Sequence, residues 1–157
     1  MKVSIDRLRQ SLTYCAETGV ISRASGGVAT YPHSKNRRRL SVCVGSVQIL
    51  AHRAAWAIHF GEWPSGEIDH INGDEADNRM KNLRDVSKSV NQQNKRKPRS
   101  DNTCGFLGVG WHKAAKKWRA QISISGRVVY LGLFDEPEIA HAAYLDAKRR
   151  IHPGFVG

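Results

Sequence analysis

The sequence is poor in the features that mark membrane proteins and disulfide-bonded domains. None of its apolar runs approaches the ~20 residues needed to cross a bilayer, and the start, Met1–Asp6, lacks the apolar core of a signal peptide. The 3 cysteines are odd in number, far apart and without a CxxC pair, which argues against a disulfide framework or a zinc knuckle. We therefore expect a cytoplasmic protein with no membrane partner and with buried or inert thiols at Cys15, Cys43 and Cys104.

Acidic residues are scarce as well. The chain of 157 residues has 14 Asp and Glu against 25 Lys and Arg, a formal net charge of +11. The excess lies in residues 1–60, with 9 basic and 2 acidic side chains, and in residues 104–157, with 8 and 4, whereas residues 61–103 carry 8 of each. A polyanion is the partner that this charge indicates. The alternative, an excess that only aids solubility, fits less well because soluble surfaces usually mix both signs.

Hydrophobic periodicity predicts an α+β protein. Apolar residues at helical spacing indicate a helix over residues 5–17, and short apolar runs indicate strands over 20–22, 40–44 and 47–50. Gly45-Ser46 is a two-residue hairpin turn between the last two strands. These elements predict a hairpin and helix platform whose basic edge comes from Lys35–Arg39.

A second helix is predicted over residues 51–60. We expect Ala55, Trp56 and Phe60 to form its apolar stripe and Gly61 to end it. His52 and His59 are interpreted as packed or capping histidines, because that role is commoner than a ligand role for a histidine on a helix.

The most informative stretch runs from Asp69 to Asn91. Ile68–His70 reads as the end of a strand, Asn72–Asp74 as a tight turn, Asn82–Val86 as a second strand, and Ser87 as the N-cap of a helix that carries Asn91. His70 has an ordinary pKa near neutrality and is the natural base for activating water. Asp69 and Asn91 offer hard oxygen ligands suited to Mg²⁺ or Mn²⁺. Spacing alone also allows an ordinary solvent loop, because Asp, Asn and Gly are common there.

Residues 92–103 lose all apolar periodicity. Lys95, Arg96 and Lys97 begin a basic linker, for which a solvated connector and a phosphate-contacting segment are both open.

The C-terminal part changes to alternating strands and one helix. Lys117–Ile124 has strict period-two alternation, and Ser125-Gly126 turns it into a strand that starts at Arg127. Asp135 is the expected cap of a helix whose inner face holds Ala140, Ala143, Tyr144 and Ala147. A three-stranded antiparallel sheet packed on one helix is the most economical fold. The polar face of the sheet carries Arg119, Gln121 and Ser123.

Several of these runs closely resemble the HNH endonucleases of phage genomes. The resemblance rests on His52–Trp56, Gly61–Pro64, Ile68–Asp74, Asp77–Arg79, Asn82–Arg84 and Asn91. It implies a ββα-metal finger in which His70 is the general base, Asp69 and Asn91 bind one divalent ion, and Asn82 holds the loop and helps to orient the imidazole. The chain has Asn91 where the commonest family pattern has His, and Asn78 is a second candidate for a structural amide.

Residues 104–157 resemble an AP2 DNA-binding domain. The matching positions are Gly108-Val109, Lys117–Ala120, Leu131–Asp135 and Ala142–Tyr144. The resemblance implies that the polar face of the sheet enters the major groove, where Arg pairs with guanine and Gln with adenine. The expected DNA-binding residues are Lys117, Arg119, Gln121, Ser123, Arg127 and Tyr130, together with Lys95, Arg96 and Lys97.

These observations predict a metal-dependent homing-type endonuclease acting on double-stranded DNA, with no small-molecule cofactor and with a monomer favoured. The expected parts are a platform over residues 1–50, a nuclease module over 51–94, a basic linker over 95–103 and an AP2-like domain over 104–157. The alternative is a non-catalytic DNA-binding regulator in which the HNH segment is scaffold. A third reading, an RNA-binding accessory protein, rests on charge alone.

Overall fold

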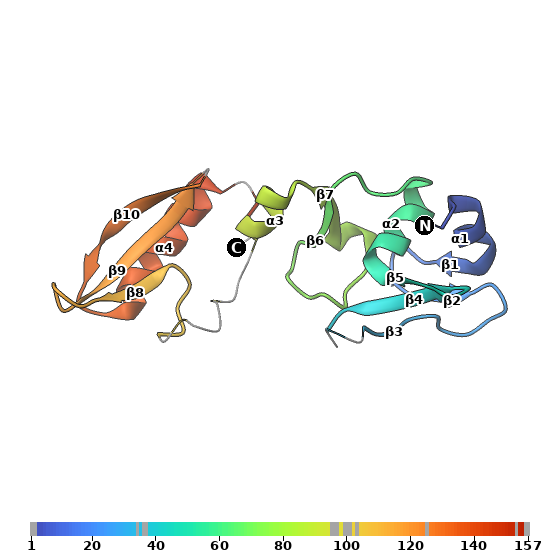
Figure 1. The fold of residues 1–157 in the computed structure, drawn as a ribbon, viewed down its shortest axis with the longest axis horizontal. Coiled ribbons are helices and arrows are strands. Elements are labelled where there is room, and N and C mark those ends of the chain that lie inside the picture. The colour runs from blue at the N-terminus through green and yellow to red at the C-terminus, as the bar shows by residue number, and fades with distance from the viewer. Residues whose placement is uncertain are drawn as a thin grey trace. The chain divides into compact units, whose positions relative to one another are not determined.

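A computed structural model describes residues 3–33, 35, 38–94, 98, 102, 104–124, 126–152 and 154–155. The chain forms two compact units, Met1–Lys88 and Ser89–Gly157. Both are built from short helices and small antiparallel sheets, as Figure 1 shows, so the predicted α+β class is confirmed. Across the described ranges, no helix is both long and apolar enough to cross a membrane.

The first unit begins with a shorter helix than the periodicity predicts. Helix α1 spans Ile5–Ser11, and its N-cap Ser4 accepts a hydrogen bond from the Arg7 backbone N–H at 3.3 Å. The chain then passes directly into strand β1 (Leu12–Tyr14), which pairs antiparallel with β2 (Ile21–Arg23). The prediction of a helix to residue 17 is wrong, because the backbone beyond Ser11 bonds to a strand that lies outside the helical window.

A three-stranded sheet follows, in the order β3 (Tyr31–Pro32), β4 (Leu40–Val44), β5 (Val47–Leu50). The hairpin predicted at Gly45-Ser46 is confirmed, with Val44 opposite Val47. Strand β3 was not predicted, because two residues give no periodic signal. Cys43 and Cys15 are exposed free thiols, so of the two expected alternatives, buried or inert, burial is wrong for both.

Helix α2 (Ala51–Phe60) lies on this sheet through alanines rather than through its aromatic residues. Its buried residues are Ala51, His52, Ala54, Ala55 and Ala57. Phe60 is 50% exposed, so the predicted stripe is wrong at that position. Small side chains let the helix approach the sheet closely, and the larger rings remain at the margin.

One hydrophobic core runs through the whole first unit. It joins Leu8, Ile21 and Val42 to the alanines of α2 and to Ile68 and Leu83. The sequence-based boundary at residue 50 therefore falls inside a single core, and residues 1–50 and 51–88 belong to one compact unit.

The remaining elements of this unit carry the site. Strand β6 (Glu67–His70) pairs antiparallel with β7 (Leu83–Val86), and the short 3-10 helix η1 (Met80–Asn82) leads into β7. The first unit ends at Lys88, the first residue of helix α3 (Lys88–Gln93), and the rest of that helix belongs to the second unit.

The second unit contains the predicted three-stranded antiparallel sheet packed on one helix. The strand order is β10 (Arg127–Phe134), β9 (Lys117–Ile124), β8 (Val109–His112), and helix α4 spans Pro137–Ile151. Ala140 and Tyr144 are buried as expected. Asp135 does not cap the helix: Glu136 occupies the N-cap without a side-chain bond, and Asp135 forms an ion pair with Lys117 at 3.1 Å.

Candidate active site

The β6–β7 ladder places two of the predicted residues side by side at the end of a buried strand. Asp69 lies opposite Arg84, and His70 lies opposite Leu83. Both Asp69 and His70 are buried. The Arg84 guanidinium donates from Nε and Nη2 to the same carboxylate oxygen, Asp69 Oδ2, at 2.9 and 2.7 Å. This charge-assisted pair holds the carboxylate in one orientation and compensates its burial.

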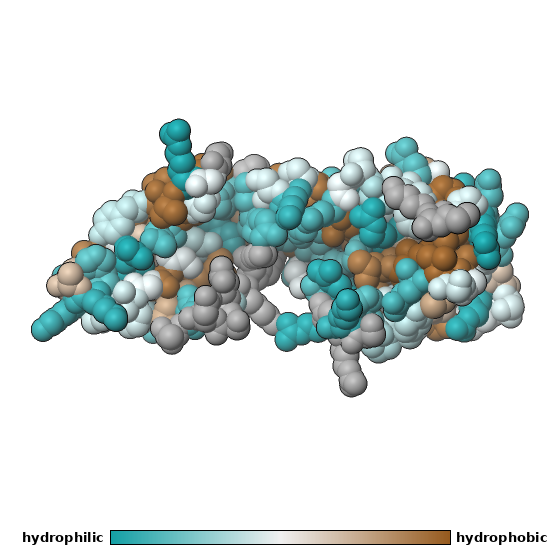
Figure 2. All heavy atoms as spheres, viewed as in Figure 1, coloured by the Kyte–Doolittle hydropathy of each residue, from teal (hydrophilic) through white to brown (hydrophobic). Residues whose placement is uncertain are grey.

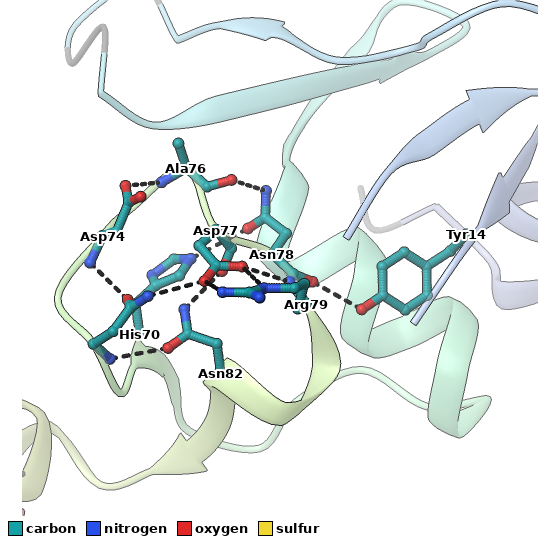
Figure 3. A network of polar contacts seen from close by, with 9 residues as sticks. Tyr14, His70, Asp74, Ala76, Asp77, Asn78, Arg79 and Asn82 are labelled. Atoms are coloured by element: carbon teal, nitrogen blue, oxygen red, sulfur yellow. Dashed lines mark hydrogen bonds and ion pairs between the residues drawn. The ribbon is translucent and has the colours of Figure 1, made fainter. Parts of the chain in front are cut away.

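Asn82 closes the loop that follows His70. Its Oδ1 accepts from the Asn72 backbone N–H at 2.9 Å, and its Nδ2 donates to the Asp77 carbonyl at 2.8 Å. The Asn82 carbonyl also accepts from the Ile71 N–H at 2.9 Å. Figure 3 shows this side chain reaching from the end of η1 into the loop. One amide therefore ties both ends of the loop over residues 71–79 to the start of β7.

The imidazole of His70 is bonded to a different amide. His70 Nε2 lies 3.2 Å from Asn78 Oδ1, and Asn78 is 2% exposed. Asn78 Nδ2 donates to the Ala76 carbonyl at 3.3 Å, which directs Oδ1 toward the ring, as Figure 3 shows. An amide oxygen only accepts, so Nε2 carries the proton and the lone pair of the neutral ring lies on Nδ1. Asn78 thus sets the tautomer of His70.

Asp77 and Arg79 stiffen the same loop. Asp77 accepts from Arg79 Nε at 2.7 Å and from Asn72 Nδ2 at 2.9 Å. The hydrogen bond from the Arg79 side chain is the largest of several contributions that lower the pKa of Asp77 to about 2. The carboxylate is therefore ionised at any pH at which a nuclease works, and the loop keeps its ion pair.

His52 was interpreted from sequence as a packed histidine outside the chemistry, yet it contacts the site. Its ring lies edge-on to that of His70, with centroids 5.1 Å apart and an interplanar angle of 87°. Burial, followed by the positive charges of His70, Arg39 and Arg53, lowers the pKa of His52 to about 3. His52 is thus a neutral ring packed against the candidate base. No periodicity could have revealed it, because the contact depends on how α2 packs against β6.

Asn91, the remaining predicted metal ligand, lies in α3 and is half-buried. Within the described part of the chain, no group of three or more His, Cys, Asp and Glu side chains could hold an ion by itself. Mg²⁺ and Mn²⁺ use few protein oxygens and complete their shells with water and phosphate oxygens, so a carboxylate and a carboxamide suit them. The same pair of oxygens suits zinc poorly, because zinc takes three or four mainly nitrogen or sulfur ligands.

In the second unit the strand register determines on which face of the sheet each predicted DNA-binding residue lies. The face of the sheet turned away from α4 carries Arg119, Gln121 and Ser123 of β9, with Tyr130 opposite Gln121 and Lys117 at the strand start. Arg127 lies opposite Ile124, which places it on the other face at the end of the sheet.

The outer face also exposes apolar surface. Val128 is 66% and Tyr130 55% exposed, and Figure 2 shows hydrophobic side chains at the surface over β10. Lys95, Arg96 and Lys97 lie outside the described residues.

Comparisons with known proteins identify the family of the chain. The sequence profile of the HNH endonuclease family matches residues 50–93, which include Asp69, His70, Asn78, Asn82 and Asn91. Protein 3.8 of Escherichia phage T7 is 34% identical over 105 residues, covering 66% of this chain and 85% of the phage protein. The chain therefore belongs to the HNH endonuclease family, and it is an enzyme.

A solved structure of the HNH homing endonuclease I-HmuI is also similar, with 25% sequence identity and a TM-score of 0.44. The match covers 60% of this chain, and the chain spans 57% of that protein.

Proposed function

We propose that this enzyme hydrolyses phosphodiester bonds in double-stranded DNA with the aid of one divalent cation, as homing endonucleases do. The observation that carries the proposal is the buried His70 imidazole, with its Nε2 bonded to Asn78, at the end of the strand that also carries the buried Asp69. The net charge of +11 supports a polyanionic substrate. The resemblance of residues 104–157 to AP2 domains supports duplex DNA rather than RNA.

In the proposed reaction His70 is the general base. With Nε2 protonated, Nδ1 carries the lone pair that takes a proton from the attacking water. Asn78 supports the ring as positive charge develops on it, because its Oδ1 accepts from Nε2 in both protonation states. Asn82 keeps the loop in place through its bonds to Asn72 and Asp77.

Asp69 and Asn91 are the residues that would hold the cation. When bound, a Mg²⁺ or Mn²⁺ ion supplies charge neutralisation at the scissile phosphate and at the departing 3′ oxygen. Arg84 fixes the Asp69 carboxylate through Oδ2 and so determines how the carboxylate meets the ion. The expected products carry 5′-phosphate and 3′-hydroxyl ends, and each active site cuts one strand.

The second unit and the basic linker would position the enzyme on DNA. Arg119, Gln121, Ser123 and Tyr130 share the outer face of the sheet, where they could contact base edges and phosphates. Lys117 and Arg127 at the margins and Lys95, Arg96 and Lys97 in the linker would add phosphate contacts. A monomer acting in the host cytoplasm is the simplest arrangement.

The test is nicking of supercoiled plasmid with Mg²⁺ or Mn²⁺. His70→Ala should lose at least about 100-fold in rate, the lower end of what general-base catalysis contributes, while its DNA affinity in a mobility-shift assay stays unchanged. His33→Ala, in the loop after β3, serves as the matched histidine control. Unchanged nicking by His70→Ala would remove His70 from the mechanism, and tight binding without cleavage by the wild type would support a non-catalytic regulator instead.

A further inference from the structure

The loop that holds Asn78 rests on the β1–β2 hairpin, which lies outside the segment matched by the family profile. The hydroxyl of Tyr14, the last residue of β1, donates to the Asn78 backbone carbonyl at 2.8 Å. Figure 3 shows Tyr14 approaching this carbonyl from the side opposite the His70 ring. Asn78, which sets the tautomer of His70, is thus hydrogen-bonded through its backbone to Tyr14, a residue far away in the sequence.

Two further contacts join the hairpin turn to the loop. The Met80 backbone N–H donates to the Ala16 carbonyl at 2.9 Å. Gly19 has a φ of 75°, and a Cβ placed there would lie 2.6 Å from the Arg79 nitrogen and 2.7 Å from the Asn78 carbonyl carbon. The two backbones therefore touch at a point where only glycine fits. The hairpin and the loop are packed backbone to backbone, so a shift of one displaces the other.

The Tyr14 hydroxyl is suited to this role at every working pH. Tyr14 is half-buried, and burial is the main cause that raises its pKa to about 12. The phenol therefore keeps its proton and remains a donor to the Asn78 carbonyl. Its ring also meets His59 of α2 edge-on, with centroids 6.3 Å apart, which fixes its position from the other side.

We propose that the β1–β2 hairpin is part of the catalytic module, with Tyr14 and Asn78 as positioning residues that hold the His70 imidazole in its Nε2–H tautomer. This inference rests on the proposed role of His70 as the base. A hydroxyl bond of this kind fixes the Asn78 backbone, and the Asn78 side chain then fixes the ring, so losing either bond should slow chemistry without weakening DNA binding.

The experiment compares single-turnover nicking rates and DNA dissociation constants of full-length variants with the ring tautomer of His70 from nitrogen-15 NMR. Tyr14→Phe should lower the rate by roughly 2- to 10-fold with unchanged affinity, as expected for one net hydrogen bond. Tyr31→Phe is the matched control, since it also removes a tyrosine hydroxyl with a hydrogen bond, to Cys43 Sγ at 2.9 Å, on a different sheet. Its rate should equal that of the wild type.

Asn78→Ala should reduce the rate by about 10- to 100-fold and give a mixture of His70 tautomers, because it removes the oxygen that accepts from Nε2. Asn78→Asp restores an acceptor for Nε2 and should recover the Nε2–H form and part of the rate. If Tyr14→Phe nicks at the wild-type rate and Asn78→Ala keeps the Nε2–H tautomer, the proposal is overturned. The NMR result does not depend on cleavage, so a His70→Ala enzyme that still nicks would refute the base assignment without deciding the positioning role.

Discussion

His52 is a buried histidine whose pKa is strongly lowered by its surroundings, which the sequence alone does not reveal. It is 6% exposed, its Nδ1 is buried with no hydrogen-bond partner among the described residues, and its ring contacts that of His70, while Arg39 and Arg53 add positive potential. Protonating it would place a charge in a poorly solvated site beside other positive groups. The folded protein therefore keeps His52 neutral.

The lowered pKa of His52 predicts that the stability of the protein decreases as the pH falls. The pKa of His52 is lowered from 6.5 to about 3 on folding, so the unfolded chain takes up a proton that the folded chain refuses. The contribution of neutral His52 to the free energy of unfolding is fully present above pH 6.5. It is lost as the pH falls from there toward 3, at roughly 1.4 kcal/mol per pH unit. His52→Phe should flatten the slope of unfolding free energy against pH by up to that amount. The measurement is urea unfolding at several pH values in this range.

His33→Phe is the control for that slope, because it removes a histidine from a loop without touching the core. Absolute stabilities of the two variants are not compared, since Phe is larger than His and changes the packing at residue 52. Parallel slopes for wild type and His52→Phe would show that His52 is protonated as readily in the folded as in the unfolded chain.

The sequence predicts Asp69, His70 and Asn82 as site residues because they lie on a local strand, turn and strand whose spacing is visible. Sequence reasoning interpreted His52 correctly as a packed histidine but did not place it against His70, and it offered Asn78 only as a second structural amide. The His52 ring reaches His70 through the packing of α2 on β6, and Asn78 reaches it through a loop whose shape depends on bonds from Asn82 and Tyr14. Long-range packing of this kind leaves no periodic signal.

At the scale of elements, the stability of the second unit depends on how closely α4 packs against its sheet. Gly108 stands before β8, and a Cβ added there would lie 2.0 Å from a ring atom of Tyr144. Gly105 has the same φ, 76°, but nothing within 4 Å of an added Cβ. The two glycines therefore separate the cost of a left-handed backbone from the cost of a steric clash.

Gly105→Ala should lower the free energy of unfolding by about 1 kcal/mol, the penalty for a side chain at positive φ. Gly108→Ala should cost that amount plus roughly 1–3 kcal/mol more, because the Tyr144 ring has to move. Hydrogen exchange at amides of β9 in the full-length protein measures both. Equal losses in the two variants would show that Tyr144 yields without strain and that the helix is held less tightly than the structure indicates.

The elements themselves divide into those that local sequence determines and those that it does not. The hairpin at Gly45-Ser46 and the strict alternation of Lys117–Ile124 were predicted, because turn chemistry and period-two patterning are local. The end of α1 was misplaced by several residues, because Leu12–Tyr14 satisfies a helical pattern equally well and only its pairing with β2 decides the outcome. The stripe on α2 was misjudged because burial there selects small rather than large apolar residues.

At the scale of the whole molecule, the proposed function assigns chemistry and DNA affinity to different residues. Asp69, His70 and Asn82 lie in the first unit, whereas the predicted DNA-binding residues Arg119 and Gln121 lie on the sheet of the second. Substitutions in the first unit should then change the rate at saturating DNA. Those on the sheet should change the salt dependence of binding instead, since each lost phosphate contact removes a released counterion.

Two double variants that remove equal charge test this division. Lys117→Ala with Arg119→Ala takes two cations from the face of the sheet turned away from α4, whereas Arg149→Ala with Arg150→Ala takes two from the last turn of α4 itself. The ion pair of Lys117 with Asp135 is largely exposed and should not compete with a phosphate. If the sheet face contacts DNA, the first pair lowers the slope of log K against log salt by about 2 and the second leaves it near the wild-type value. Equal changes in both pairs would mean that net charge, rather than the sheet face, holds the DNA.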